Sequence, residues 1–535
     1  MPTPVIPTGA NPVTYLGAVG DGASHPLSSI TSCQGQSTAA WTLAQWRVLF
    51  PSAQALTDEI DEMAIQRWCD LNTRAVAVDI PPGIFLIKRG VTTGQQSVCL
   101  RGAGVGVTEL WAMSAGMTLW THGTAASPAN GIWTASDLMI RPKAICAAIF
   151  NVRFSGNQPV WCHVMRDIQC ISSDITNYFE NAFITRNIKR GLDWKNLIVF
   201  GKNFAILTTN AFEFPANVDN SLAGNSYNFI NCMTVGYNFG WNFGFDGFTS
   251  SNNHMHEEAQ FYNCQSYSGR GFFQALNGNF NYAPADNWTF NSCGWQGTGP
   301  GFNIQYLEEV RIRDTLLVND DTTSPDHVTF ASILNCDSVY FDQNELFSTQ
   351  NSSGITAIYV AGSRTRNVYI NRNDIVNYAT WNEFVYVAND VPAIGVEERA
   401  TTFTGTGSYT HGKFNDASGL AVSETRAREK ADLPNPATTP IASSVAVDVT
   451  SGGDITYNAV FTTITSDGFG NTTVYFPDGL FRSIKSVTPN NHNINKSTSW
   501  VVTAQFNTGG VTVRYPAGGI PAGTSVDTHI VVIGR

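Results

Sequence analysis

Residues 287–291 read NWTFN, and the same alternation of apolar and polar residues occurs before and after them, as YNFIN at 227–231, AQFYN at 259–263 and EVRIR at 309–313. Since the side chains of a strand alternate between its two faces, each copy predicts a short strand with one apolar face. The copies recur about every 29 residues. Their end points are Arg141, Gln169, Val199, Asn231, Asn263, Asn291, Arg313, Asp342 and Asn371.

A second apolar strand follows in most of these units, for example GFFQAL at 271–276 and ITAIYVA at 355–361. A unit of this length without a helix cannot bury its apolar face alone, so it must stack on its neighbours. Helical repeats of similar length are excluded, because strong helix formers at 3.6-residue spacing are missing. The sequence therefore predicts an all-β chain whose main part is a right-handed parallel β-helix of about 9–11 coils.

Stacked coils bring like residues into columns. We expect one column of amides, Asn231, Asn263 and Asn291, that satisfies turn groups. A second column would hold small thiols as interior fillers, one residue past the end points: Cys170, Cys232 and Cys264.

The segments outside the repeat predict covers and a further domain. The segment at 57–72 places Ile60, Met63, Ala64, Trp68 and Leu71 on one stripe of a helix that would cap the first coil. Short alternating strands between glycine-rich turns indicate a C-terminal β-sandwich. The predicted parts are a short N-terminal attachment segment (1–12), a cap and lead-in (13–97), the β-helix (98–398), a linker (399–440) and the sandwich (441–535).

Composition narrows the functional classes. The net charge is −11 and only 14% of residues are charged, with no basic cluster, so a nucleic acid is an unsuitable partner. We expect no membrane insertion, since no apolar run reaches the ~20 residues of a membrane span, and no secretory signal is visible. The 10 cysteines form no close CxxC pairs, which argues against a zinc site or a disulfide scaffold.

Four segments in the first 110 residues carry a family resemblance. In order they are VTYLGAVGDGASHPLS (13–28), LTDEIDEMAIQRW (56–68), VDIPPGIFLI (78–87) and LRGAGVGVTEL (100–110). Together they resemble the pectate-lyase-like superfamily of phage tailspikes and prophage tail depolymerases. The resemblance implies a homotrimer, attachment to a phage tail or baseplate adaptor through the N-terminus, and a C-terminal domain that trimerises or binds sugar. It also implies a virion-tail protein, made in the host cytoplasm, that acts on polysaccharide at the bacterial surface.

The acids in the repeat suggest glycoside hydrolysis, which needs two carboxylates about 5 Å apart for retention or 6.5–9.5 Å apart for inversion. Stacked strands lie about 4.8 Å apart, so acids in one column meet the first requirement. Counting five residues back from the end points places Glu258, Asp286, Glu308 and Asp337 in one column, with Glu257 and Glu309 beside it. Repulsion along such a row should raise some pKa values, as a general acid requires. The candidate catalytic residues are Glu257, Glu258, Asp286, Glu308 and Glu309; solvated turn residues or a cation-binding row are the alternatives.

Sugar binding needs aromatic platforms and polar groups near these acids. The candidates are His256, Tyr282, Trp295, Tyr306, Trp241 and Arg313. Trp288 has inward parity in its strand, whereas Trp295 and Tyr282 are expected to be exposed. We expect neither a metal nor a cofactor, because NNHMHEEAQ at 252–260 lacks the helical H-E-x-x-H spacing.

Two other functions remain open at the level of sequence. A polysaccharide lyase would use a base such as His256 and an arginine or cation that steadies the uronate carboxylate. A non-catalytic receptor-binding adhesin would keep the aromatic groups without a close acid pair. The preferred hypothesis is an endo-acting depolymerase of a bacterial capsular polysaccharide or exopolysaccharide.

Overall fold

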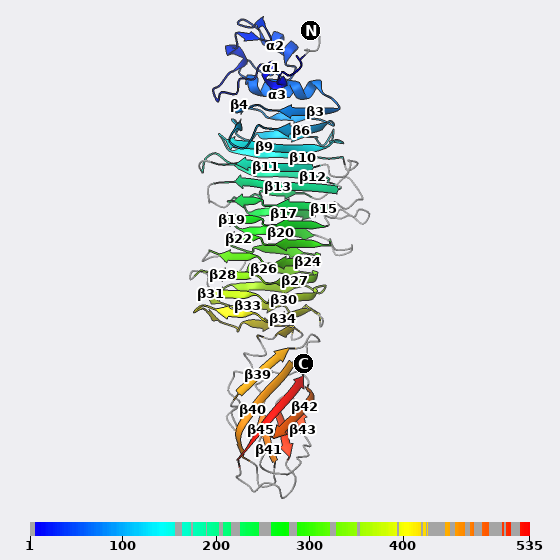
Figure 1. Cartoon of the computed structure of the whole chain (residues 1–535), viewed down its shortest axis with the longest axis vertical. Helices are drawn as coiled ribbons and strands as arrows, with labels where there is room; N and C mark the ends of the chain where they lie inside the picture. The colour runs from blue at the N-terminus through cyan, green and yellow to red at the C-terminus, as the bar shows by residue number, and fades with distance from the viewer. Residues whose placement is uncertain are drawn as a thin grey trace.

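The largest part of the described structure is a parallel β-solenoid, which appears in the computed structural model as a rod of stacked strands (Figure 1). The predicted fold class, an all-β chain built around a parallel β-helix, is confirmed. The structure describes residues 6–155, 163–172, 175–188, 190–202, 207–215, 225–245, 258–277, 286–320, 328–349, 354–392, 395–418, 421–423, 425, 444–449, 455–465, 471–475, 484–491, 505–507, 510–514 and 525–534.

Each typical coil carries three strands. One belongs to a twelve-stranded parallel sheet, and the other two, here called its first and second strands, belong to a second parallel sheet. The twelve-stranded sheet consists of β5 (Val91–Thr93), β8 (Thr118–His122), β10 (Cys146–Arg153), β12 (Phe179–Arg186), β14 (Phe212–Phe214), β17 (Phe239–Phe245), β20 (Gly271–Asn277), β23 (Phe302–Gln305), β26 (Val328–Leu334), β29 (Thr356–Ala361), β33 (Glu383–Val387) and β37 (Phe414–Asp416).

The second sheet follows the repeat found in the sequence. Its first strands are β3 (Ala75–Asp79), β6 (Ser97–Arg101), β9 (Trp133–Pro142), β11 (His163–Cys170), β13 (Arg190–Phe200), β15 (Asn225–Ile230), β18 (Ala259–Tyr262), β21 (Trp288–Asn291), β24 (Glu308–Arg313), β27 (Asp337–Asp342), β30 (Arg366–Asn371), β34 (Val396–Arg399) and β38 (Val422–Ser423). Its second strands are β4 (Gly83–Ile87), β7 (Thr108–Ala112), β16 (Met233–Val235), β19 (Gln265–Gly269), β22 (Gly294–Gly297), β25 (Leu316–Asn319), β28 (Glu345–Ser348), β31 (Asp374–Asn377) and β35 (Thr402–Thr404). The long strands β9 and β13 pair with strands of both sets.

Two ladders of turn residues with left-handed backbone flank the first strands. The exit ladder runs through the long strands β11 and β13 and follows the first strands β15 to β30. Its φ lies between 50° and 57° at Asp167, Asn196, Asn231, Asn263, Ser292, Asp314, Gln343 and Arg372. The entry ladder, before them, has φ between 51° and 65° at Ser226, Glu258, Asn287, Glu309, Ser338 and Asn367. Asparagine tolerates this conformation better than most residues, which accounts for its frequency in the repeat.

The predicted amide column is partly correct. Asn263 Nδ2 donates to Asn231 Oδ1 at 2.9 Å, and Asn231 Nδ2 donates to Asn196 Oδ1 at 3.1 Å. Asn291, however, pairs with Tyr262 and lies one position before the exit ladder, where Ser292 takes its place. The alignment by polar end points was therefore wrong by one residue from Asn291 onward, because that strand has polar residues at both positions.

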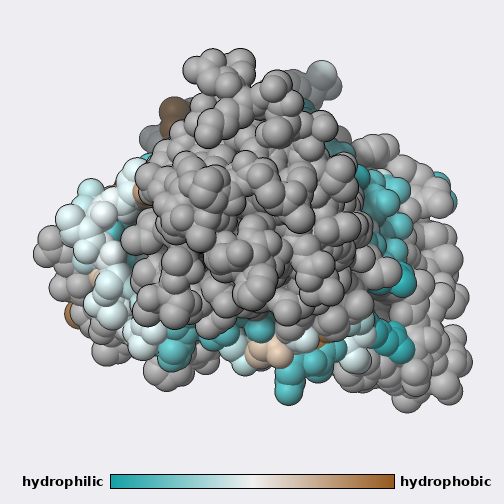
Figure 2. All heavy atoms as spheres, turned by 90° about the horizontal axis from the view of Figure 1, so that it is seen from below, coloured by the Kyte–Doolittle hydropathy of each residue, from teal (hydrophilic) through white to brown (hydrophobic). Residues whose placement is uncertain are grey.

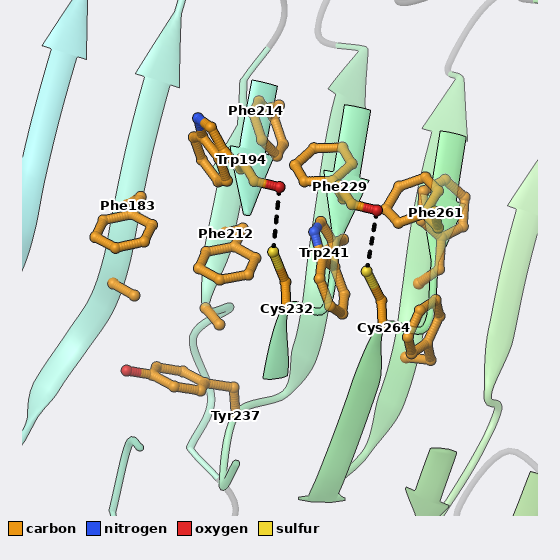
Figure 3. Packing of buried hydrophobic residues seen from close by; sticks show 14 of the residues in the cluster. Phe183, Trp194, Phe212, Phe214, Phe229, Cys232, Tyr237, Trp241, Phe261 and Cys264 are labelled. Atoms are coloured by element: carbon orange, nitrogen blue, oxygen red, sulfur yellow. Dashed lines mark hydrogen bonds between the residues drawn. The ribbon is translucent and has the colours of Figure 1, made fainter. Parts of the chain in front are cut away.

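The thiol column contains a similar correction. Cys170 is buried but pairs with Val199, outside the column, whereas Cys293 follows Ser292 and takes the place after Cys264. The described cysteines are all free, and only Cys99 among them is exposed. Cys232 and Cys264 are interior fillers, as predicted, whose Sγ atoms donate to the carbonyl oxygens of Trp194 at 3.6 Å and Phe229 at 3.4 Å (Figure 3).

Aromatic rings fill the middle of the solenoid and stack from coil to coil. Phe183 and Phe212 lie parallel with ring centroids 5.3 Å apart, and Phe229 and Phe261 with centroids 4.7 Å apart (Figure 3). Trp194 packs edge-on against Phe212 and Phe229. Since truncating one such ring to alanine costs about 3–5 kcal/mol, this interior fixes the relative height of neighbouring coils and of the side chains that they carry outside.

The N-terminal cap is built from α1 (Pro12–Tyr15), a 3₁₀ turn η1 (Leu27–Ser29), the short pair β1 (Ser32–Cys33) and β2 (Gln36–Ser37), α2 (Leu43–Leu49) and α3 (Ile60–Leu71). The predicted helix is confirmed as α3, which packs against β3, β4 and β5 at the start of the solenoid (Figure 1). Its acidic residues Asp61 and Glu62, in the first turn, are buried. Asp61 accepts hydrogen bonds from the amides of Val19, Gly20 and Leu86, so this carboxylate fastens the cap to the first coil.

The solenoid extends beyond both predicted boundaries. It begins with β3, which pairs with β6, and it continues through β35, β37 and β38 after residue 398. A short pair, β32 (Thr380–Trp381) and β36 (Ser408–Tyr409), also lies there. Buried Glu398 accepts hydrogen bonds from the Ser423 hydroxyl at 2.7 Å and from the Thr425 amide and hydroxyl at 3.0 Å, and it clasps the chain to the last coil.

The C-terminal strands form two antiparallel sheets, as a β-sandwich requires. One contains β39 (Ser444–Val449), β40 (Ile455–Thr465), β45 (Ser525–Gly534) and β42 (Ile484–Asn491); the other contains β41 (Asn471–Tyr475), β44 (Gly510–Arg514) and β43 (Gln505–Asn507). Seen from below, most of the surface that the described residues present around the rim is hydrophilic (Figure 2).

Candidate active site

The candidate acids lie in the turn that leads from the twelve-stranded sheet into the first strands. Asp286 and Glu308 occupy equivalent positions on adjacent coils, because β21 and β24 pair in parallel with Trp288 opposite Val310. The Asn287 amide donates to the Glu308 carbonyl oxygen at 3.1 Å across this pair. Backbone spacing of about 4.8 Å between adjacent strands brings two such side chains within the range that a retaining carboxylate pair uses.

The column continues on the next two coils. Glu308 lies opposite Asp337, and Asp337 lies opposite Arg366. Three acids and one arginine therefore follow one another along the rod. Glu257 precedes Glu258 and lies outside the described residues.

The predicted single column of four acids is wrong at Glu258. This residue belongs to the entry ladder beside Asn287 and Glu309, one position from Asp286, and its amide donates to the Asp286 carbonyl oxygen at 3.0 Å. The cause is the same one-residue slip that misplaced Asn291, since the positions were counted back from the end points. The acids form two adjacent columns, with Glu258 and Glu309 flanking the Asp286 and Glu308 pair.

Asp337 is held by other groups. Arg366 Nε donates to its Oδ2 at 2.5 Å, Asn367 Nδ2 donates to its Oδ1 at 2.9 Å, and the Ser338 hydroxyl donates to the same oxygen at 3.1 Å. Its side chain is buried. A carboxylate with these partners is poorly placed to react, but its negative charge acts on Glu308.

The pKa values of the two remaining acids are raised. For Glu308 the main cause of the raised pKa is desolvation, followed by repulsion from Asp337, while Arg366 acts in the opposite direction. For Asp286 the pKa is raised by partial desolvation of its carboxyl group and then by repulsion from Glu309 and Glu258. Glu308 and Asp286 also repel each other, so protonation of one favours ionisation of the other. This is the electrostatic arrangement of an acid and a carboxylate that act together.

The flanking glutamates occupy an unusual backbone conformation. The entry ladder carries serine or asparagine at its other positions, whereas Glu258 and Glu309 have φ of 54° and 51°. A non-glycine residue in this region costs about 1 kcal/mol or more, and short polar side chains bear it best. Glu258 accepts a hydrogen bond from the Ser226 hydroxyl at 3.0 Å, and Glu309 lies 3.7 Å from Arg311.

Three of the predicted sugar-binding aromatics do not form platforms. Trp241 and Trp295 are fully buried in the solenoid, which contradicts the expected exposure of Trp295. Trp295 occupies an inward position of the second strand β22, in which buried residues alternate with more exposed ones. Tyr306 is 8% exposed, and its hydroxyl accepts a hydrogen bond from Asn335 Nδ2 at 3.0 Å. Trp288 is buried, as its parity predicted.

The remaining predicted residues divide into two groups. Arg313 is exposed at the end of β24, the strand that begins with Glu308. His256 and Tyr282 lie outside the described residues, as does Glu257, so their roles stay predictions.

Two tyrosines that were not among the candidates lie on the strands that begin with Asp337 and Arg366. Tyr340 and Tyr369 stack on adjacent coils with ring centroids 5.2 Å apart and an angle of 17° between the rings. The Arg311 guanidinium lies 5.8 Å from the centre of the Tyr340 ring. The signal was present in the sequence, because Arg311, Tyr340 and Tyr369 share the central, outward position of three repeat copies.

The described residues contain no group of three or more His, Cys, Asp or Glu side chains placed to hold a metal ion. No helix in the described part of the chain is long and apolar enough to cross a membrane.

The solved structures to which this chain is similar include phage tailspikes. The tailspike gp49 of Pseudomonas phage LKA1 is 13% identical over 97% of this chain and 99% of that one, with a TM-score of 0.44. The tailspike gp61 of Pseudomonas phage phi297 is 13% identical over 98% of each chain, with a TM-score of 0.43. The tailspike of the E. coli bacteriophage HK620, solved in complex with a pentasaccharide, is 7% identical over 91% of this chain and 90% of that one, with a TM-score of 0.38. No family model and no curated protein matches the chain.

Proposed function

We propose that the protein is a phage or prophage tailspike that depolymerises a bacterial capsular polysaccharide or exopolysaccharide by endo-acting glycoside hydrolysis. The observation that carries the proposal is the pairing of Asp286 and Glu308 on adjacent coils, each with a raised pKa and each flanked by further acids. The family resemblance of the first 110 residues supports the same function.

In the proposed reaction Glu308 is the general acid and Asp286 the nucleophile. Glu308 donates its proton to the glycosidic oxygen as the bond to the leaving sugar breaks, and Asp286 attacks the anomeric carbon to form a glycosyl-enzyme. Water, deprotonated by Glu308, then releases the sugar from Asp286. The close spacing of adjacent coils favours this double displacement over inversion, so the product should keep the anomeric configuration of the substrate.

The test is incubation of the purified protein with capsular polysaccharide or exopolysaccharide from a host whose cells it binds. New reducing ends without ultraviolet absorption support hydrolysis. New reducing ends with the absorption of an unsaturated sugar would indicate a lyase instead, and an unchanged polymer size would indicate an adhesin.

Single substitutions test whether Asp286 and Glu308 are the catalytic pair. Glu308→Gln and Asp286→Asn should each reduce cleavage at least a hundredfold, since each removes one of two groups needed in the transition state. The matched control is Asp374→Asn, which removes an exposed acid from the second strand β31 and should leave the rate unchanged. Near-normal cleavage by both site variants would contradict the assignment.

The same proposal includes a homotrimer that joins a phage tail or baseplate adaptor through residues 1–12. Light scattering coupled to size-exclusion chromatography measures the first part directly. A mass of one chain would contradict it without affecting the assignment of the acids.

A further inference from the structure

The strand that begins with Glu308 also carries two arginines on its outer face. Along β24, Val310 and Ile312 point into the solenoid, while Arg311 and Arg313 alternate with them and point outward. Arg311 lies near Glu309 and over the Tyr340 ring. Arg313, two residues further, is the more exposed of the two.

Arg313 differs from the other arginines on the first strands. Those whose side chains the structure describes are paired with carboxylates: Arg101 with Asp79, Arg141 with Glu109, Arg166 with Asp193, Arg311 with Glu309, Arg366 with Asp337 and Arg399 with Glu397. Arg313 has no carboxylate partner among the described residues. The nearest candidate across the strands is Asp342, and Arg372 already binds both of its oxygens, at 3.0 and 2.6 Å.

The neighbours of Arg313 are suited to a sugar. In the preceding coils its position is taken by Asn291 and then by Tyr262, whose side chain is 53% exposed. An exposed aromatic ring offers an apolar face to a pyranose, and a guanidinium offers paired donors to an oxyanion. Tyr262, Asn291 and Arg313 form one outward row across three coils, here called the Arg313 row.

The distance to the acids restricts what can bind there. Arg313 lies five positions after Glu308, and because Glu309 has left-handed backbone, the span is at most about 17 Å. An anionic group at the acids would meet like charges, whereas at Arg313 it would meet an uncompensated positive charge. A bound polymer can satisfy both places only if its negative charge lies some sugar units away from the bond that is cut.

We infer that the substrate is an acidic polysaccharide and that the Arg313 row binds its anionic substituent, a carboxylate or a phosphate, at a subsite apart from the cleaved bond. This inference rests on the proposed function for the position of the cleaved bond. Binding at the row can nevertheless be measured without any cleavage.

The experiment is affinity electrophoresis of the whole protein in native gels. The gels contain alginate or hyaluronan as carboxylate polymers, teichoic acid as a phosphate polymer, or dextran as a neutral one. A protein of net charge −11 should be retarded by a polyanion only through a local basic site. We expect retardation in a carboxylate or phosphate gel that exceeds that in dextran and weakens with added salt.

Arg313→Gln should raise the dissociation constant for the retarding polymer at least tenfold. Arg101→Gln, an exposed and ion-paired arginine near the other end of the same sheet, is the matched control and should leave it unchanged. Equal retardation of wild type and Arg313→Gln, or no anionic gel exceeding dextran, would overturn the inference. Loss of cleavage in Glu308→Gln together with unchanged binding by Arg313→Gln would end the inference and leave the proposed function intact.

Discussion

At the scale of single residues, the negative charge on Asp337 helps to set the pKa of Glu308. Asp337 does not need to touch a substrate, since Arg366 and Asn367 hold it in place. Its repulsion, together with desolvation, raises the pKa of Glu308 above the ordinary 4.5. Glu308 therefore keeps its proton at a higher pH than a solvated glutamate would.

This arrangement predicts the pH dependence of cleavage. The general acid must be protonated, so the rate should fall as pH rises through the raised pKa of Glu308. Asp337→Asn removes the repulsion and leaves Arg366 uncompensated, and both changes lower the pKa of Glu308. The alkaline limb of the kcat/KM profile should therefore move to lower pH.

The matched control for this profile is Asp342→Asn. It removes an ion-paired aspartate from the other end of β27, where Arg372 is the partner. Its alkaline limb should coincide with that of the wild type. A limb that stays in place in Asp337→Asn would mean that Glu308 is not the group that titrates.

The sequence predicted the residues of this site better than their arrangement. Asp286, Glu308 and Glu309 were identified because acids recur at a fixed distance before each strand. The register was wrong at Glu258, since polar residues at both Asn291 and Ser292 hide which of them ends the strand. Trp295 was predicted to be exposed but is buried. Which residues of a short second strand point inward depends on where the preceding left-handed turn falls, and the sequence does not mark that turn.

At the scale of elements, the exit ladder makes each turn depend on its neighbour. Asn263 has φ of 50° and donates from its side chain to Asn231 on the coil before. The residue thus has two functions: it tolerates the backbone conformation, and it links two coils.

Substitution separates these two functions. Asn263→Gly removes only the hydrogen bond, at about 0.5–1.5 kcal/mol, because glycine adopts the left-handed conformation freely. Asn263→Val adds the steric cost of a branched side chain there, about 1–2 kcal/mol more. Urea unfolding should therefore rank wild type above the glycine variant and the glycine variant above the valine variant. Equal midpoints for the two variants would show that backbone conformation does not limit this turn.

At the scale of the whole molecule, the fold class could be predicted because a period of about 29 residues with inward apolar positions leaves few alternatives to a solenoid. The first and last residues of the solenoid could not be predicted. The first coils lack the polar end points of the later ones, and β35 to β38 are too short to repeat the pattern, although they pair in register with it.

The cap supplies a prediction at this scale. Asp61→Ala leaves the buried amides of Val19, Gly20 and Leu86 without an acceptor, and each costs about 1–3 kcal/mol. We expect a lower thermal midpoint and faster proteolysis of the N-terminal residues. Asp70→Asn, at an exposed position of the same helix, keeps an acceptor for Gln66 Nε2, so it is the control and should change neither. Unchanged proteolysis in Asp61→Ala would mean that α3 is held by its apolar contacts alone.

The Glu398 clasp at the opposite end has a mechanical consequence. A coil inside the rod is held by two neighbours, whereas a terminal coil has one, so strain applied along the chain should peel coils away singly from an end. Three hydrogen bonds to the buried Glu398 carboxylate hold the last coil in place, and the helix α3 covers the first. In a single-molecule pulling trace the protein should lengthen by a series of similar steps. The order of the steps would reveal whether the α3 cap or the Glu398 hydrogen bonds break first.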